Sequence, residues 1–423
     1  MNTFLDKVRL VWGDNTLRNR ILFALGALVI FRLLATIPVP GIDASRLASF
    51  FSGNQFLGLL NLFSGGGFSS LSIVMLGVGP YITASIIMQL LTVIFPSLKA
   101  LHQEEGDAGR RRFAQYSRMI AVPLALIQGF AFLTLLIRQG VISPLTPFAM
   151  GTNLLIITAG ALLIMWIGEL ITEFGVGNGT SLIIFAGIVA QLPQSLSQLY
   201  YTFDPSQIPL YIAFLVAAIA VIFGVVVITE AERPIPITYA KRVRGSKVFG
   251  GISTYLPLRV NQAGVVPIIF ALSILLFPQM LFTYLATLSH VTLKAVSTFV
   301  LNIIANQWFY AGAYFILVFL FTYFYTAVTF DPNQISENLQ KSGAFIPGVR
   351  PGQPTSEYIA KILTRLTLVG AIFLGLIAVL PLLMQSLTGI QALSIGGTGL
   401  LIVVSVVIDL IKKIEAQISA REY

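Results

Sequence analysis

Long hydrophobic runs alternate with short polar stretches along almost the whole chain. A window of about 19 residues separates ten apolar segments, most of them close to the roughly 20 residues that carry a helix across a bilayer core. These segments cover residues 21–39, 72–95, 120–137, 153–172, 181–196, 209–229, 263–285, 308–330, 368–387 and 397–411. The fifth and tenth segments are short, which favours positions buried in protein. The pattern predicts an all-α polytopic membrane protein with ten transmembrane helices.

Residues 63–95 depart from a simple spanning pattern. Three glycines, Gly65, Gly66 and Gly67, precede a half-polar stretch that is too short to cross a membrane, and a Gly-Val-Gly-Pro break then leads into an apolar helix. Backbone that is not fully helical survives at membrane depth only where it is buried in protein or faces a water-filled cavity. The stretch therefore predicts a cavity and a short re-entrant piece that could lie inside it.

Basic residues predict the orientation of the segments. An even number of spans places both termini on one side, and 22 of the 26 Lys and Arg residues fall on that side, against three on the other and Arg32 within a segment. Cytoplasmic loops carry the excess of Lys and Arg. Both termini are therefore predicted to be cytoplasmic.

The link between the fifth and sixth segments divides the chain at its midpoint. It separates an N-terminal half, residues 1–196, from a C-terminal half, residues 197–423, with five segments in each. An odd number of spans per half requires the two halves to be inverted relative to one another. The tight Gly/Asn link at residues 173–181 makes the fourth and fifth helices an antiparallel pair.

Two long cytoplasmic loops interrupt the C-terminal half. Residues 230–260 alternate β-branched and polar side chains, which predicts a hairpin. Residues 331–367 have a Pro/Gly-rich middle, which predicts a firm projecting loop. A small-solute carrier does not need such protrusions, so they indicate docking of something large.

Composition limits the chemistry that the chain can perform. Only 10% of the residues are charged, whereas soluble domains carry about 25%. The chain has no cysteine and two distant histidines, so no metal site or cofactor is expected. It contains no P-loop, HExxH or GxSxG motif, so no enzymatic activity is expected. What remains is a pore-like architecture whose energy must come from a partner.

Several motifs resemble one family, the bacterial branch of the SecY/Sec61α protein-conducting channel subunits. The motifs are IPVPGID at 37–43, NLFSGGGFSSLSIVMLGVGPYITASIIMQLL at 61–91, GDAGRRRFAQYSR at 106–118, GVGNGTSLIIFAGIV at 175–189, YAKR and STYLPLRVNQAGVVPIIFA within 239–271, FDPNQISENLQKSGAFIPGVRPGQPT at 330–355 and GGTGLLIVVSVVIDL at 396–410. They occur in order over nearly the whole chain.

The resemblance implies an hourglass channel of two inverted five-helix halves, closed on the outside by a short plug helix at about residues 63–74. The plug residues it implies are Gly65, Gly66, Gly67, Phe68, Ser69, Ser70 and Leu71. The constriction ring it implies consists of Ile82, Ile86, Ile184, Ile188, Ile269 and Ile402. Sequence alone does not distinguish these isoleucines from ordinary packing residues, although the pairs 82/86 and 184/188 have the i, i+4 spacing of one helix face.

The resemblance also implies a lateral gate between the second and seventh segments, with the third and eighth beside it. Candidate gate residues are Thr83, Ser85, Gln89, Thr92, Pro267 and Pro278. The polar side chains are expected to bond across the closed gate or to hold helices together generally. Each proline is expected to remove a helical hydrogen bond and so loosen the seventh helix.

The protruding loops resemble docking sites for the ribosome and for the SecA motor ATPase. Arg350 matches the family's motor-coupling arginine, and Lys241, Arg242, Arg244 and Lys247 match its basic hairpin. The hairpin carries fewer charges than the family pattern, which should weaken binding to ribosomal RNA.

The function implied is that of the central channel subunit of the Sec translocase in a bacterial plasma membrane, or a thylakoid membrane. Its partners would be SecE-like and SecG-like small subunits, SecA, ribosomes, nascent secretory and membrane-protein chains, and membrane lipids. The alternative, on architecture alone, is a secondary active transporter for a small solute. Ion-coupled carriers usually place an ionisable group near the midplane, and the carboxylates here fall toward the cytoplasmic ends.

Overall fold

A computed structural model describes most of the 423 residues. The residues outside its description are 1–11, 41–66, 68–69, 104, 139, 141, 202–204, 206–207, 240–241, 245–246, 250–252, 287–290, 389–390 and 423.

Each predicted apolar segment overlaps one helix of the structure. In chain order these helices are α2 (Asn15–Leu34), α5 (Gly79–Ile94), α7 (Gly106–Arg138), α8 (Pro147–Phe174), α9 (Gly179–Tyr201), α10 (Ile208–Glu230), α11 (Val266–Leu285), α13 (Gln307–Thr329), α15 (Gln353–Thr388) and α16 (Gln391–Glu422). Among the described residues, α7, α8, α10, α13 and α15 contain stretches long and apolar enough to cross a membrane. The chain is therefore a mostly helical, multi-pass membrane protein.

The helices differ from the predicted segments mainly in length. Helices α9 and α16, with 23 and 32 residues, are longer than the fifth and tenth apolar segments. The apolar part of α9 is short, as predicted, and covers Gly179–Pro193. Hydropathy registers only the apolar part of a helix, and polar turns at both ends of α16 extend it. Three further helices, α6 (Pro96–Gln103), α12 (Val291–Ala305) and α14 (Pro332–Lys341), were not predicted.

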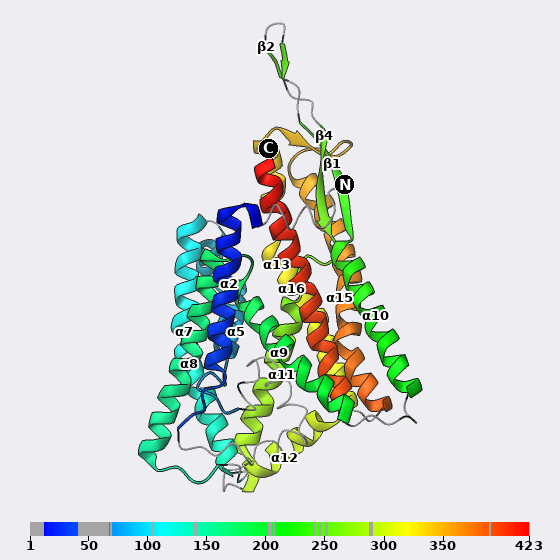
Figure 1. Ribbon diagram of the computed structural model, residues 1–423. Coiled ribbons are helices and arrows are strands. Elements are labelled where there is room, and N and C mark those ends of the chain that lie inside the picture. The colour runs from blue at the N-terminus through cyan, green and yellow to red at the C-terminus, as the bar shows by residue number, and fades with distance from the viewer. Residues whose placement is uncertain are drawn as a thin grey trace.

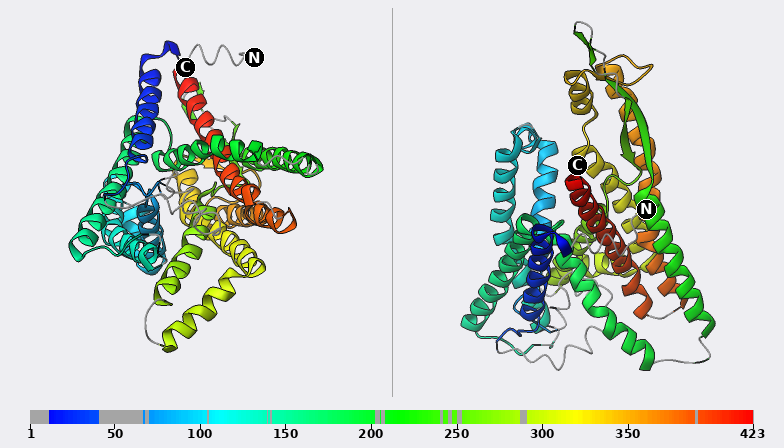
Figure 2. Two further views of the ribbon diagram at one scale, coloured as in Figure 1. Left: turned by 60° about the horizontal axis from the view of Figure 1, so that its bottom comes forward. Right: turned by 45° about the horizontal axis from the view of Figure 1, so that its top comes forward.

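The described spanning helices fall into two sets with the same pattern of neighbours. In the first set, α2 contacts α8 and α9, α5 contacts α7, and α7, α8 and α9 follow one another as neighbours. In the second set, α10 contacts α15 and α16, α11 contacts α13, and α13, α15 and α16 follow one another in the same way. In Figure 2, α2, α5, α7 and α8 gather on one side of the molecule and α13, α15 and α16 on the other.

A short turn joins α8 to α9, as the Gly/Asn link predicts. The Thr172 hydroxyl donates to the Gly168 carbonyl at 2.9 Å and accepts from the Gly179 amide at 2.9 Å. Asn178 Oδ1 accepts from the Ser181 amide at 3.2 Å and so caps the start of α9. The antiparallel pairing of these two helices is confirmed.

The predicted hairpin at residues 230–260 is also confirmed. Strand β1 (Glu232–Tyr239) pairs antiparallel with β4 (Ser253–Arg259), and β5 (Ala344–Phe345) adds to the other edge of β1. Beyond this sheet, β2 (Arg242–Arg244) pairs with β3 (Lys247–Phe249). Figure 1 shows the sheet and the β2–β3 ribbon projecting from the end of the molecule at which α16 finishes.

The second predicted loop, residues 331–367, is more ordered than a bare projecting loop. It contains α14 and β5, and a small apolar core joins it to the sheet and to α15 through Ile235, Leu258, Ile346, Ile359 and Ile362. Asp331 caps α14 by accepting from the Asn333 amide at 2.9 Å. The hairpin at residues 230–260 and the loop at residues 331–367 therefore form one folded unit.

Gly160 provides a test of how closely α8 packs against the chain that precedes α5. A Cβ added at Gly160 would lie 2.0 Å from the Ile73 carbonyl oxygen, whereas one added at Gly151 of the same helix meets nothing within 4 Å. We expect Gly160→Ala to lower the free energy of unfolding by about 1–3 kcal/mol through overpacking.

The matched control, Gly151→Ala, should leave stability unchanged or raise it by up to about 1 kcal/mol, because alanine favours helix more than glycine does. Thermal unfolding in detergent, followed by intrinsic fluorescence, checks both variants. Equal midpoints for G160A and G151A would contradict the close packing.

Candidate functional site

The largest apolar cluster of the described residues lies where the two sets of helices meet. Its members come from helices of both sets, and α5 contacts α11 while α9 contacts α16 across the boundary. All six isoleucines of the predicted ring belong to this cluster or pack against it: Ile82 and Ile86 on α5, Ile184 and Ile188 on α9, Ile269 on α11, and Ile402 on α16. The isoleucines thus lie on four of the helices that make contacts between the two sets.

Ile82 is more exposed than the other five isoleucines. Ile402 is fully buried, and Ile86, Ile184, Ile188 and Ile269 expose 6% of their surface or less. Ile82 is half-buried and packs against the cluster. Branched aliphatic side chains offer no hydrogen bonds, so such a cluster can close around an apolar or extended chain without selecting its sequence.

The described part of the predicted plug lies next to α2. The Ser70 hydroxyl donates to the Ala35 carbonyl at 2.8 Å, and the Val39 amide donates to the Leu71 carbonyl at 2.8 Å. Of the plug helix predicted at about residues 63–74, the structure describes, besides Gly67, residues 70–74, which form turns and an isolated β-bridge between Ser72 and Pro38. Leu71 has a φ of 44°, a value that L-residues rarely adopt and that a regular right-handed helix excludes.

The remaining plug residues are only partly visible. Gly67 is buried, and its carbonyl accepts from the Ser72 amide at 2.9 Å. Gly65, Gly66, Phe68 and Ser69 lie outside the described residues.

The helices of the predicted lateral gate are neighbours. Helix α11 contacts both α5 and α7, and it packs along α13 on its other side. The predicted gate has the second segment (α5) against the seventh (α11), with the third (α7) and the eighth (α13) beside them. The observed contacts agree with this arrangement.

The polar residues on α5 do not all behave as predicted. The Thr83 hydroxyl donates to the Gly79 carbonyl at 3.0 Å, and the Thr92 hydroxyl donates to the Gln89 carbonyl at 2.6 Å. Both hydroxyls bond to their own helix, so the expectation that they bond across the gate is wrong. The cause is general: a threonine hydroxyl reaches the carbonyl three or four residues earlier in its helix.

Gln89 differs from the threonines. Its side-chain oxygen is buried without a hydrogen-bond partner among the described residues. Ser85 is half-buried on the same helix. Among the predicted polar gate residues, Gln89 is therefore the one whose buried side-chain oxygen lacks a hydrogen bond within the described part of the chain.

The two gate prolines have different effects. Pro278 lies inside α11, where it removes a helical hydrogen bond. Pro267 is the second residue of α11, and the first four amides of a helix have no partner within it. The expectation that Pro267 loosens the helix is therefore wrong. Helices α7 and α9 contain internal prolines that we did not single out, Pro123 and Pro193.

Arg350 lies on an exposed turn that the surrounding loop holds firmly. Gly348 and Gly352 flank it with φ of 83° and 97°, conformations that favour glycine. The Arg350 carbonyl accepts from the Thr355 hydroxyl at 2.8 Å, and the Ser336 hydroxyl of α14 donates to the Gly352 carbonyl at 2.6 Å. The guanidinium thus projects from a fixed backbone.

The hairpin residues of the predicted docking site lie at the far end of the projecting ribbon (Figure 1). In the β2–β3 ladder Arg244 is opposite Lys247, and Arg242 begins the strand. Lys241 lies outside the described residues.

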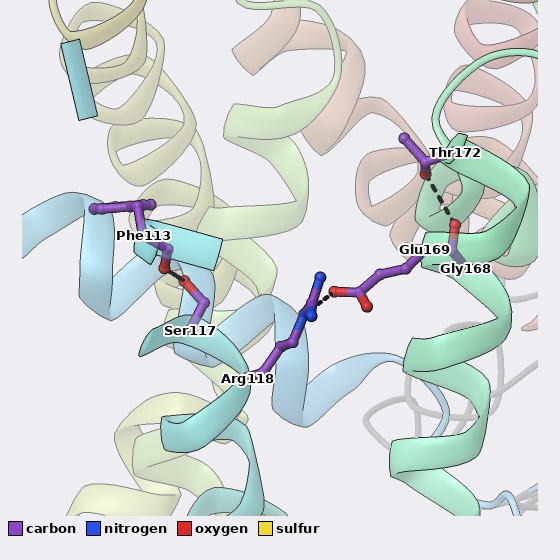
Figure 3. A network of polar contacts seen from close by, with 6 residues as sticks. All are labelled: Phe113, Ser117, Arg118, Gly168, Glu169 and Thr172. Atoms are coloured by element: carbon purple, nitrogen blue, oxygen red, sulfur yellow. Dashed lines mark hydrogen bonds and ion pairs between the residues drawn. The ribbon is translucent and has the colours of Figure 1, made fainter. Parts of the chain in front are cut away.

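One ion pair joins two helices in each set, and the sequence revealed neither pair. Arg118 Nε of α7 lies 2.5 Å from Glu169 Oε1 of α8 (Figure 3), and Lys412 Nζ of α16 lies 2.8 Å from Glu230 Oε1 of α10. The partners are far apart in the chain, so no local spacing could have paired them. Each pair braces the helices of one set.

Comparison with known proteins places the chain in a family. A family profile described as SecY matches residues 72–411. The chain is 40% identical to protein translocase subunit SecY of Mycobacterium bovis, covering all of this chain and 99% of that protein, and 43% identical to its counterpart of Thermus thermophilus, covering 96% and 94%.

Solved structures share the fold at lower sequence identity. A structure described as that of a protein conducting channel has a TM-score of 0.66 at 19% identity, covering 96% of this chain and 93% of that one. Sec61 in a canine ribosome–channel complex has a TM-score of 0.61 at 18% identity, with the same coverage. The profile match, and the identity to relatives over their full length, show that this chain belongs to the SecY family.

Proposed function

We propose that this protein is the channel-forming subunit of a Sec protein translocase. It passes unfolded secretory polypeptides across the membrane and releases transmembrane segments into lipid through a lateral gate. The observation that carries the proposal is the gathering of Ile82, Ile86, Ile184, Ile188, Ile269 and Ile402 in one apolar cluster at the meeting of the two helix sets. Family membership favours this function over a carrier for small solutes, and it favours a channel over a catalyst.

The channel has ten spans in two inverted halves, residues 1–196 and 197–423. The repeated neighbour pattern supports this division, because α2, α5, α7, α8 and α9 contact one another as α10, α11, α13, α15 and α16 do. With the basic residues concentrated at one end, both termini lie in the cytoplasm of a bacterial cell and the spans lie in its plasma membrane.

The isoleucine ring is the permeability barrier. When the channel is empty, a constriction lined by aliphatic side chains blocks ions by dewetting. When a polypeptide passes, the same side chains close around it. The segment at about residues 63–74 plugs the outer side, and its bonds to Ala35 and Val39 hold its C-terminal part against α2.

The lateral gate opens between α5 and α11. The contact between them has the apolar cluster at its centre, and Gln89 offers a buried polar group on α5 that an incoming chain could satisfy. Pro278 weakens the backbone of α11 and eases its displacement. Parting this seam exposes a translocating apolar segment to lipid, where each Leu gains a few tenths of a kcal/mol.

The cytoplasmic unit binds the partners that supply energy. Arg350 and the basic hairpin at Lys241, Arg242, Arg244 and Lys247 contact the SecA motor or a translating ribosome. Two of the structures similar in fold are ribosome complexes, of canine Sec61 and of yeast Ssh1. SecE-like and SecG-like subunits complete the translocase in the membrane.

A charge in the ring should open an ion leak. We expect Ile86→Asp to raise the resting conductance of channels reconstituted in planar bilayers at least tenfold, because a carboxylate retains water in the constriction. The control is Ile94→Asp on the same helix, where the side chain is 67% exposed at the cytoplasmic end and outside the cluster. Conductance of I86D equal to that of the wild type and I94D would contradict the ring.

Reversing the charge at Arg350 should uncouple the motor without opening the pore. We expect Arg350→Glu to reduce SecA-driven translocation of a secretory precursor into vesicles by at least tenfold, while resting conductance stays at the wild-type value. Lys341→Glu is the matched control, since Lys341 is an exposed cation of the same loop that pairs with Glu337 within α14. Equal losses in R350E and K341E would show a general charge effect instead of a contact at Arg350.

A further inference from the structure

A pocket of about 260 Å³ opens where β1 leaves the end of α10 and runs beside the first turns of α15. Its lining residues are Arg233, Tyr358, Lys361, Ile362, Arg365 and Leu366. One water molecule occupies roughly 30 Å³ of liquid, so the pocket has room for a group several times that size. It is separate from the apolar cluster at the centre of the molecule and from the turn that carries Arg350.

The pocket has a cationic rim over an apolar floor. Three of its six lining residues are basic, and Ile362 and Leu366 supply the floor. Tyr358, Lys361, Ile362, Arg365 and Leu366 follow the i, i+3, i+4 spacing of one face of α15. Arg233 completes the rim from β1. A phosphate with attached apolar chains has the complementary character.

None of the three cations is neutralised. Arg233, Lys361 and Arg365 form no ion pair with any residue that the structure describes. Glu230 pairs with Lys412, and Glu357 accepts from the Gln353 amide at 3.0 Å. Glu232 precedes Arg233 on β1, where successive side chains point to opposite faces of the strand. Three unpaired cations around one pocket repel each other unless an anion enters.

The pocket lies at the level where the apolar parts of both helices begin. On α15 the charges end at Arg365, and residues 366–384 carry no charged side chain. On α10 the apolar run ends at Glu230. Below the pocket, Val369, Ile372 and Leu376 continue the face of Arg365 at i+4, i+7 and i+11, and all three side chains are exposed. Figure 1 shows α10 and α15 side by side beneath β1.

We propose that this pocket binds the phosphate headgroup of an anionic phospholipid of the cytoplasmic leaflet. Arg233, Lys361 and Arg365 hold the phosphate, and the acyl chains run down the exposed face of α15 over Val369, Ile372 and Leu376. Arginine suits this task because its planar fork donates two parallel hydrogen bonds to phosphate oxygens. The bound lipid would fasten the cytoplasmic sheet to the membrane at the foot of β1.

The test measures lipid binding to the full-length protein together with any subunits that co-purify with it. Native mass spectrometry compares retention of dioleoylphosphatidylglycerol with that of dioleoylphosphatidylcholine. Each basic residue near an anionic surface contributes about 1 kcal/mol, so Arg365→Gln should weaken binding of phosphatidylglycerol about fivefold and R365Q/K361Q about 25-fold. Arg365→Lys should retain most of the binding.

Lys341→Gln is the matched control, because it removes one exposed positive charge outside the pocket. It should bind phosphatidylglycerol as the wild type does, and all variants should unfold at the same temperature in phosphatidylcholine. Equal retention of the two lipids by the wild type, or equal losses in K341Q and R365Q, would overturn the proposal.

Two further outcomes would assign the pocket to another anion. Full competition by millimolar inorganic phosphate would make the ligand a soluble phosphate. Unchanged lipid binding by R365Q/K361Q, with weakened binding to ribosomes, would make it ribosomal RNA.

Discussion

The architecture depends on an apolar contact between two helix sets that are each braced internally by charge. Arg118 pairs with Glu169 inside the first set, and Lys412 pairs with Glu230 inside the second. Between the sets, α5 meets α11 and α9 meets α16 through the isoleucine-rich cluster. In a membrane, lipid tails and a passing apolar segment are as hydrophobic as the isoleucines themselves, so parting such a contact exchanges one apolar surface for another. The proposed gate uses this property: two internally braced helix sets meet at a seam that would open at low cost.

Much of the fold could be predicted from the sequence because the bilayer imposes strong rules. Unsatisfied backbone groups are so costly in lipid that each long apolar run must become a helix, and each predicted segment overlaps one. The hairpin at residues 230–260 followed from its period-two pattern, which places Ile235 and Ile237 inside and Pro236 outside. Helix α12 was missed because this apolar helix has 15 residues, fewer than the roughly 20 of a spanning segment. Helix α14 is amphipathic, and a hydropathy window averages its polar and apolar faces.

The candidate site could be predicted only through the family resemblance. Ile86 and Ile402 have no local feature that distinguishes them from other isoleucines, and only their position where the helix sets meet makes them candidates for a ring. The errors at Thr83, Thr92 and Pro267 have a different source. Residue type suggested the role of each, but position within the helix decides whether a hydroxyl reaches its own backbone or a proline removes a hydrogen bond. The turns at residues 70–78 depend on long-range contacts with α2 and with Gly160, which local propensity does not contain.

The most direct measurement of the central claim is a crosslinking map from a secretory polypeptide stalled during translocation. A photoreactive amino acid is placed in turn at Ile82, Ile184 and Ile269, and for comparison at Ile127 of α7, which is 61% exposed on the outside of the helix bundle. If the isoleucines surround the path, all three positions should crosslink to the stalled chain and position 127 should crosslink to lipid alone. Crosslinks that are absent from the three isoleucines, or equally strong at position 127, would contradict a polypeptide path through the middle of the molecule.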